Sequence, residues 1–364
     1  MGRQSAMVVV VLLLVTIECV VGVQDAEILH DPKLRERARR NNISCLLVFG
    51  DSSVDPGNNN VLNTTFKGNF LPYGIDFLHH QPTGRFCNGR LTTDFIAEAL
   101  GIKYAIPPFL KPGLRREELI HGVSFASAAS GYDDLTANLT NVLPIRKQIQ
   151  YLMHYMVQLR QFVGEQKERE TIKNAIIVIS AGTNDFIQNY FITPGRSKEF
   201  TIDQYIDFLI KCLARDIQEM HALGATRFVV VGVPPLGCMP LVQALHGKNE
   251  CVAEINQVVV KFNNKIRQKL DTANLWLGAQ ATTTYVDAYS VLLNAIAQPA
   301  KYGFSVSTKG CCGSGVIEFG DTCKGQSTCS DPSKYVFWDA VHPSERMYQI
   351  IAIEAIKQVN KQMI

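Results

Sequence analysis

The sequence predicts an α/β protein, with a three-layer α/β/α fold on a parallel, flavodoxin-like five-stranded sheet. Two observations lead to this prediction. Short runs of apolar and β-branched residues recur along the chain, and such runs are typical of strands buried on both faces of a parallel sheet. Longer stretches with apolar residues at helical spacing lie between them. Alternation of strands and helices favours a layered α/β architecture.

Each expected strand is one apolar run. The clearest are 175–180, which reads Ala-Ile-Ile-Val-Ile-Ser, and 227–233. Three further runs are shorter, at 45–49, 122–126 and 283–286. In a sheet of this kind ligands bind beyond the carboxyl ends of the strands, so functional residues are expected there.

The expected helices alternate with these strands. Residues 145–163 place Ile149, Leu152, Met156 and Leu159 on one helical face. Similar patterns cover 202–223 and 253–270. The last helix, 344–359, is expected to start just after a proline, as helices commonly do.

Composition indicates one globular domain. The 364 residues are 46% hydrophobic and 19% charged, which excludes a disordered chain. No linker, repeat or low-complexity tract divides it, so we expect a single domain over 45–364 with an N-terminal arm at 23–44. The net charge is +3, and the densest basic run, 33–40, contains Glu36. We interpret this run as a solvated helix face or a flexible arm and expect no nucleic-acid partner.

The first 22 residues have the pattern of a secretory signal peptide. Arg3 precedes an apolar run from Ala6 to Ile17, and the small residue Gly22 marks the expected cleavage site. The apolar run is too short to span a bilayer. The alternative is an uncleaved anchor. We therefore predict a secreted, extracellular protein without a stable membrane anchor.

Sequons and cysteines fit export. Three Asn-x-Ser/Thr sequons predict glycosylation at Asn42, Asn63 and Asn138. Ten cysteines are present, and removal of the signal peptide would take Cys19 and leave an odd number. Disulfides are expected among those clustered toward the C-terminus, rather than a zinc site, because no CxxC pair occurs. Cys212, inside an apolar helical pattern, is the expected unpaired thiol.

Ser52 is the candidate nucleophile. It follows the first expected strand in Phe49-Gly50-Asp51-Ser52-Ser53. A serine placed after a buried strand and beside a glycine is exposed on a tight turn, where free backbone N–H groups can face its reaction centre. The alternative is that Ser52 only caps a helix. Asp51 and Asp55 are expected to shape this turn through local hydrogen bonds.

Three further residues complete the candidate site. Asn184 follows the 175–180 strand, where its side-chain amide can donate to a developing oxyanion, although the segment could also be a simple turn. His342 stands just before the last helix, and Asp339 precedes it by three residues. That spacing allows Asp339 to orient the imidazole, which then accepts the proton of Ser52.

With these motifs in view, the sequence resembles the GDSL esterase/lipase family of the SGNH hydrolase superfamily, in its secreted plant branch. The resemblance runs from about Cys45 to the C-terminus, and the plant branch implies the cell wall or apoplast as the extracellular location. It is carried by ordered blocks at 49–55, 82–90 (Pro-Thr-Gly-Arg-Phe-Cys-Asn-Gly-Arg), 122–127, 182–185 and 339–343.

The resemblance implies roles for the matching positions. Ser52 would be the nucleophile and first oxyanion donor through its N–H, Asn184 a further donor, and Asp339 and His342 the rest of a triad. The family's remaining oxyanion donor is a glycine N–H, and the matching position here is Ala129. An alanine keeps the N–H but carries a steric cost where φ is positive. Cys87 stands where the family often has serine.

The predicted function is hydrolysis of carboxylic (acyl) esters through an acyl-enzyme. The substrate would be a small-molecule or lipid ester, or an acylated cell-wall polymer. No cofactor and no metal are expected, because nucleotide-binding loops and metal-ligand spacings are missing from the sequence. Two alternatives stay open: an acyltransferase that uses the same acyl-enzyme, and a weakened or non-catalytic exported glycoprotein, favoured by Ala129.

Overall fold

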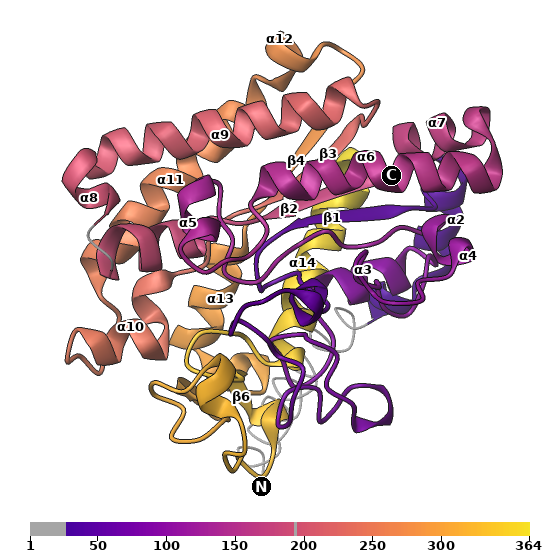
Figure 1. Ribbon diagram of the computed structural model, residues 1–364. Helices are drawn as coiled ribbons and strands as arrows, with labels where there is room; N and C mark the ends of the chain where they lie inside the picture. Colours follow the sequence, from indigo (N-terminus) through magenta and orange to yellow (C-terminus); the bar gives the residue numbers. More distant parts are fainter. Residues whose placement is uncertain (1–26, 193–194) are drawn as a thin grey trace, which may run out of the picture.

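A parallel sheet forms the centre of the molecule (Figure 1). The computed structural model describes residues 27–192 and 195–364, so the predicted signal peptide and Cys19 lie outside the described residues. The main sheet has four regular strands in the order β1-β2-β3-β4, all parallel. They are β1 (Leu46–Gly50), β2 (Ile176–Ser180), β3 (Arg227–Val231) and β4 (Thr282–Val286). β1 is buried at every position, as its continuous apolar run predicts.

The expected strand at 122–126 is not a regular strand. It lies beside β1 in the place of a fifth strand, with a parallel bridge between Val48 and Ser124. The Val48 N–H donates to Val123 O at 3.1 Å, and the Phe125 N–H donates to Val48 O at 2.7 Å. Gly122 adopts φ +96°, outside the extended region, which interrupts the ladder. The prediction of a regular fifth strand was therefore wrong, although the segment occupies its place.

Helices cover both faces of the sheet, as Figure 1 shows. One face carries α6 (Ile145–Val163), α7 (Glu165–Asn174), α9 (Ile202–Ala222) and α11 (Ala253–Asp271). The opposite face carries α3 (Thr92–Ala99), α13 (Ala288–Ala297) and α14 (Glu345–Gln362). The predicted three-layer α/β/α class is confirmed. Among the helices of the described residues, none is long and apolar enough to cross a membrane.

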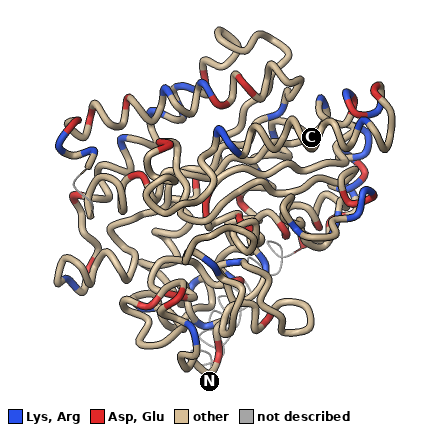
Figure 2. The backbone as a smooth tube through the Cα atoms, in the orientation of Figure 1, with Lys and Arg blue, Asp and Glu red and all other residues tan. Residues whose placement is uncertain are grey.

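Residues 27–44 pack onto this domain. They form η1 (Ile28–His30) and α2 (Pro32–Arg40), and the Asp31 side chain caps α2 by accepting from the Lys33 N–H at 2.9 Å. The buried side chains Leu29, Leu34 and Ala38 join the main hydrophobic core. The basic residues of 33–40 are thus a helix face. Figure 2 shows Lys and Arg interspersed with Asp and Glu along the outer helices.

A small disulfide-linked lobe adjoins the sheet. It contains the parallel pair β5 (Val306–Gly310) and β6 (Tyr335–Phe337) and the turns η7 (Gly320–Cys323) and η8 (Pro332–Lys334). Two disulfides close it, Cys311–Cys329 and Cys312–Cys323. The backbone N–H groups of both Cys311 and Cys312 donate to Trp338 O. The lobe is therefore tied to the residue just before Asp339.

The cysteines pair as disulfides, as expected, which rules out the zinc alternative for those six. The third disulfide is Cys238–Cys251. Cys212 is unpaired and buried, which confirms that expectation, and Cys45 and Cys87 are also unpaired and buried among the described residues. Burial raises the pKa of the Cys212 thiol to about 12, so it stays a neutral thiol.

The remaining elements are short and connect these layers. They are η2 (Asn58–Val61), η3 (Leu78–His80), α4 (Arg116–Leu119), α5 (Asp134–Asn138), the π-helix η4 (Asp185–Ile192), α8 (Arg196–Glu199), η5 (Leu236–Cys238), α10 (Pro240–Leu245), α12 (Ala273–Leu277) and η6 (Pro299–Tyr302).

Candidate active site

The sheet topology brings three sequence-predicted residues to one edge. The chain leaves β1 and enters the 122–126 segment on one side of it, then returns to β2 on the other side. Such a reversal opens a crevice at the carboxyl ends of the strands. Ser52 follows β1, Ala129 follows the 122–126 segment, and Asn184 follows β2. Ala129 and Asn184 therefore come from the two segments that lie on either side of β1, the strand that precedes Ser52.

The turn that presents Ser52 depends on Gly50. Gly50 adopts φ +141°, and a Cβ at this position would lie 1.9 Å from Ser180 O, so no other residue fits without movement of β2. Gln148 on α6 binds both backbone groups of Gly50. Its Oε1 accepts from the Gly50 N–H at 2.9 Å, and its Nε2 donates to Gly50 O at 2.9 Å. Gln148 was not found by sequence reasoning, because an amide on a helical face carries no motif.

Ser52, His342 and Asp339 form a hydrogen-bonded chain. His342 Nε2 lies 2.8 Å from Ser52 Oγ, and His342 Nδ1 lies 2.7 Å from Asp339 Oδ2. The Asp339 carboxylate can only accept, so the proton is assigned to Nδ1, and Nε2 is free to accept from the Ser52 hydroxyl. Asp339 is fully buried and His342 nearly so, while Ser52 is half-buried. The structure thus brings the three predicted residues together.

A tight turn holds Asp339 and His342 in position relative to each other. The N–H groups of Val341 and His342 both donate to Asp339 Oδ1, at 2.8 and 2.6 Å. The ring of Phe86, from the 82–90 block, packs against the imidazole of His342 with centroids 4.9 Å apart. The 82–90 block therefore contributes a side chain that packs against the His342 ring.

Tyr73 is a further partner that the sequence analysis missed. Its hydroxyl donates to Asp339 Oδ2 at 2.7 Å and accepts from the Gly320 N–H at 2.7 Å. Tyr73 is fully buried, and burial together with the Asp339 charge raises its pKa well above the ordinary value. The phenol therefore stays protonated and spreads the negative charge of Asp339. No spacing in the sequence links two residues so far apart.

We expect Tyr73→Phe to move the acid limb of the pH–rate profile to higher pH. Loss of the phenol donor concentrates charge on Asp339, which favours the imidazolium form of His342. A purely structural role would lower the rate equally at every pH. The measurement is kcat/KM from pH 5 to 9 for both proteins; coincident normalised profiles would contradict the assignment.

Three N–H groups that follow neighbouring segments of the sheet are candidate oxyanion donors. The backbone N–H groups of Ser52 and Ala129 have no acceptor among the described residues. Asn184 Nδ2 donates one hydrogen to Ser130 O at 2.9 Å, which leaves its second hydrogen available. Donors of this kind, held in place before reaction, suit a developing oxyanion.

Ala129 adopts the left-handed conformation, with φ +68°. Its methyl group is buried in a small apolar cluster with Ala137, Val142 and Phe66. An alanine at positive φ costs about 1–2 kcal/mol, whereas burial of the methyl contributes about 0.8 kcal/mol. The steric cost expected from the sequence is present, and packing offsets a large part of it.

We expect Ala129→Gly to change little. Relief of strain is opposed by the lost methyl and by about 0.4–1 kcal/mol of added unfolded-chain entropy. The free energy of unfolding should therefore stay within about 1 kcal/mol of the original. Because the N–H is kept, kcat should also stay within about threefold. Denaturant unfolding and ester kinetics check both; a rise in kcat above tenfold would show that the alanine impairs the site.

Acidic residues shape the surrounding loops. Asp51 Oδ1 accepts from the Ser53 N–H and hydroxyl, as local bonding predicts. Asp55 accepts locally from the Gly57 N–H, and also from the Ala128 N–H at 3.0 Å. Burial raises the pKa of Asp55 to about 6. Its role is thus wider than the turn, because it holds the residue before Ala129.

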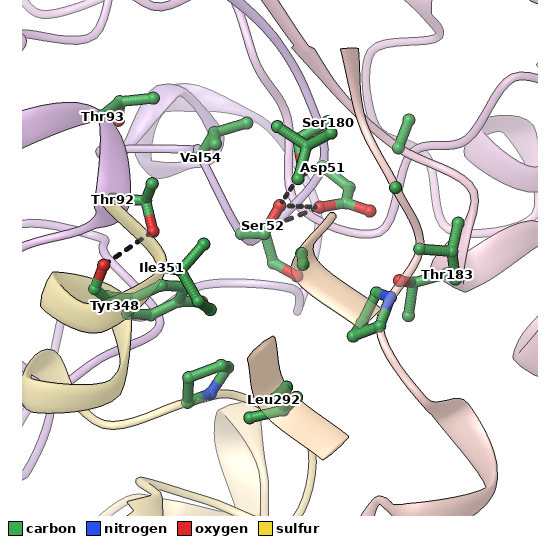
Figure 3. A pocket seen from close by; sticks show the side chains of 18 of the residues that line it. Asp51, Ser52, Val54, Thr92, Thr93, Ser180, Thr183, Leu292, Tyr348 and Ile351 are labelled. Carbon is green, nitrogen blue, oxygen red and sulfur yellow. Dashed lines mark hydrogen bonds between the residues drawn. The ribbon is translucent and has the colours of Figure 1, made fainter. Parts of the chain in front are cut away.

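A pocket opens at this constellation (Figure 3). Ser52 and His342 lie on its wall, together with residues of β2, β3, α3, α13 and α14. Most of the lining is aliphatic. The pocket therefore joins the hydrogen-bonded chain to an apolar space on the α14 side of the sheet.

A serine, a histidine and an aspartate hydrogen-bonded in this order have the arrangement that is typical of serine hydrolases. Comparison with known proteins agrees with this class. The family profile described as GDSL-like Lipase/Acylhydrolase matches residues 46–355. The chain therefore belongs to the GDSL-like lipase/acylhydrolase family, whose members are carboxylic ester hydrolases.

Several relatives come from Arabidopsis thaliana. The chain is 50% identical to GDSL esterase/lipase At5g45950 over 331 residues, which cover 91% of this chain and 92% of that protein. It is 44% identical to GDSL esterase/lipase At5g45960, with 87% of each chain covered. It is 42% identical to GDSL esterase/lipase APG, with 87% of this chain and 91% of that protein covered. The family resemblance drawn from the sequence is confirmed.

Proposed function

We propose that this chain hydrolyses acyl esters through an acyl-enzyme on Ser52, with His342 as base and Asp339 as its orienting acid. The single observation that carries the proposal is the 2.8 Å contact between Ser52 Oγ and His342 Nε2 at the mouth of an apolar pocket. The free N–H donors of Ser52, Ala129 and Asn184 support it as an oxyanion hole.

The geometry supports the following sequence of steps. Ser52 Oγ attacks the ester carbonyl and gives its proton to His342 Nε2. The three N–H donors hold the oxyanion of the tetrahedral intermediate. His342 then gives the proton to the leaving alcohol, and the acyl group stays on Ser52. A water, deprotonated by His342, attacks the acyl-enzyme and releases the carboxylic acid.

Active-site labelling tests the proposal. A fluorophosphonate probe should react with the folded protein at Ser52 and abolish hydrolysis of p-nitrophenyl acetate in proportion to labelling. Peptide mass spectrometry identifies the labelled serine. Label on another serine, or hydrolysis that survives complete labelling, would refute the nucleophile assignment. Addition of an alcohol and analysis of the products separates hydrolysis from acyl transfer.

We expect activity to fall in acid. Protonation of His342 removes the base that must accept the Ser52 proton. The measurement is kcat/KM for p-nitrophenyl acetate in buffers of constant ionic strength. A rate that is flat from pH 5 to 9 would count against His342 as base.

We also propose that the protein is an exported glycoprotein. Three disulfides support an oxidising compartment. The three sequon residues Asn42, Asn63 and Asn138 are all exposed, as glycan attachment requires. Expression in plant cells, followed by N-terminal sequencing and glycosidase treatment of the medium, tests export, cleavage near Gly22 and modification together. Retention of an unprocessed chain inside the cells would contradict the proposal.

A further inference from the structure

The pocket beside Ser52 extends into the interior of the molecule. Its deeper walls are Val178 on β2, Val229 on β3, Leu292 on α13, and Ile351 and Ala355 on α14. We call the space between these five residues the apolar chamber. Each of the five is at least nine-tenths buried. The chamber therefore lies between the sheet and the helices of the α14 side, and is not a groove on the surface.

From these features we propose that the apolar chamber binds the acyl chain of the substrate and limits its length. This inference rests on the proposed ester hydrolysis at Ser52. The acyl group is the part of the ester that stays attached to Ser52, whereas the alcohol must leave. A space that starts at Ser52 and runs inward suits the attached group.

Several polar groups of the wall already have hydrogen-bond partners within the protein. Thr92 Oγ1 donates to the backbone O of Tyr348 at 3.1 Å, as drawn in Figure 3. Ser180 Oγ lies 2.8 Å from Ser53 Oγ. The Tyr348 hydroxyl is buried without a partner among the described residues, and most of the other lining residues are apolar. Such a lining fits an alkyl chain and disfavours a sugar or a charged group.

The dimensions indicate a medium chain. Tyr348 and Ala355 both line the pocket and are seven residues apart on α14, which corresponds to roughly 10 Å along the helix axis. An extended chain covers that distance in roughly eight to nine bonds, taking about 1.1–1.2 Å per bond from the reach of a polypeptide. The whole pocket, including its mouth at Ser52, has a cavity volume of about 80 Å³, whereas a cavity needs roughly 10–15 Å³ to hold one water. The chamber is therefore narrow, and it suits one unbranched chain of about eight carbons.

The experiment compares p-nitrophenyl acetate, butanoate, octanoate and palmitate. In the original protein kcat/KM should rise from acetate to octanoate and gain nothing further at palmitate, because each buried methylene is worth roughly fourfold in binding. Ala355→Leu fills the far end, so the octanoate-to-acetate ratio of kcat/KM should fall at least about tenfold. Ala288 lines the pocket at the start of α13, near the end of β4. Because this part of the wall is nearer the strand ends, Ala288→Leu should also lower the butanoate-to-acetate ratio.

A matched control and a second substrate series make the result decisive. Ala297→Leu is the same change at an exposed position at the end of α13, and both ratios should stay as in the original protein. Ethyl, butyl and octyl acetate vary the alcohol instead of the acid. If Ala355→Leu changes discrimination among these alcohols and not among the acids, the chamber binds the alcohol and the inference is wrong.

Failure of the proposed function gives a different result. An acetate rate that is unchanged in Ser52→Ala would overturn ester hydrolysis at Ser52. A rate that depends on Ser52 but shows the same chain-length ratios in Ala355→Leu, Ala288→Leu and the original protein would overturn only the acyl chamber. Thermal unfolding of each variant shows whether it is folded. Should Ala355→Leu not fold, Ala288→Leu decides alone.

Discussion

Ser52→Ala should abolish ester hydrolysis while the fold is kept. In a serine protease, loss of the nucleophile lowers kcat by roughly 10⁶-fold, since the histidine and aspartate have nothing to activate. We expect a loss of at least about 10⁴-fold here, because the free N–H donors can still polarise a bound ester toward water. The removed hydroxyl makes one hydrogen bond, to His342, so the free energy of unfolding should change by only about 1 kcal/mol.

The neighbouring serine gives the matched control. Ser53 is also half-buried, but its hydroxyl donates to Asp51 and contacts Ser180. Ser53→Ala loses these two hydrogen bonds, and neither is made to His342 or to the proposed oxyanion donors, so kcat/KM should fall by no more than about tenfold. Kinetics with p-nitrophenyl butanoate and thermal unfolding of both variants check this. More than 1% of the original activity in Ser52→Ala would remove Ser52 from the mechanism.

Much of the fold follows from local pattern. The helix at 145–163 and the strand at 227–231 begin at the residues that the apolar pattern predicts. In both, the pattern of apolar residues within the segment itself determines which side chains are buried. The segment at 122–126 could not be judged in this way. Its apolar residues are buried as in a strand, but it also pairs with Pro108, and this pairing is a property of the tertiary structure.

The residues of the candidate site also fall into two groups, those that a local sequence pattern locates and those that only the tertiary structure reveals. Ser52, Asn184 and His342 stand at strand ends or at a helix start, and those positions can be located in a sequence. Tyr73 and Gln148 cannot, because each acts on a residue about a hundred positions away or more. Their side chains are common types on unremarkable segments. The residues that we propose to carry the reaction could therefore be located in the sequence, whereas Tyr73 and Gln148, which contact them or their turn, required the structure.

Asn184→Ala should lower kcat by about 10²–10³-fold, the usual cost of one oxyanion donor. The side chain has two N–H hydrogens, and only one is used, by Ser130 O at 2.9 Å. The second gains its partner when charge develops on the carbonyl oxygen. Since this bond strengthens in the transition state, the loss should appear in kcat, with KM changed less than about threefold.

A structural role for Asn184 would give a different signature. The bond to Ser130 O ties β2 to the loop that carries Ala129, so loosening of this loop would raise KM and lower the stability together. Asn184→Asp keeps the size of the side chain but replaces the donor with a carboxylate that repels an oxyanion. It should be at least as slow as Asn184→Ala, because the added charge opposes the intermediate that the amide stabilises. Near-original kcat in Asn184→Asp, with a raised KM in both variants, would assign Asn184 to loop positioning and leave the backbone N–H groups of Ser52 and Ala129 as the oxyanion hole.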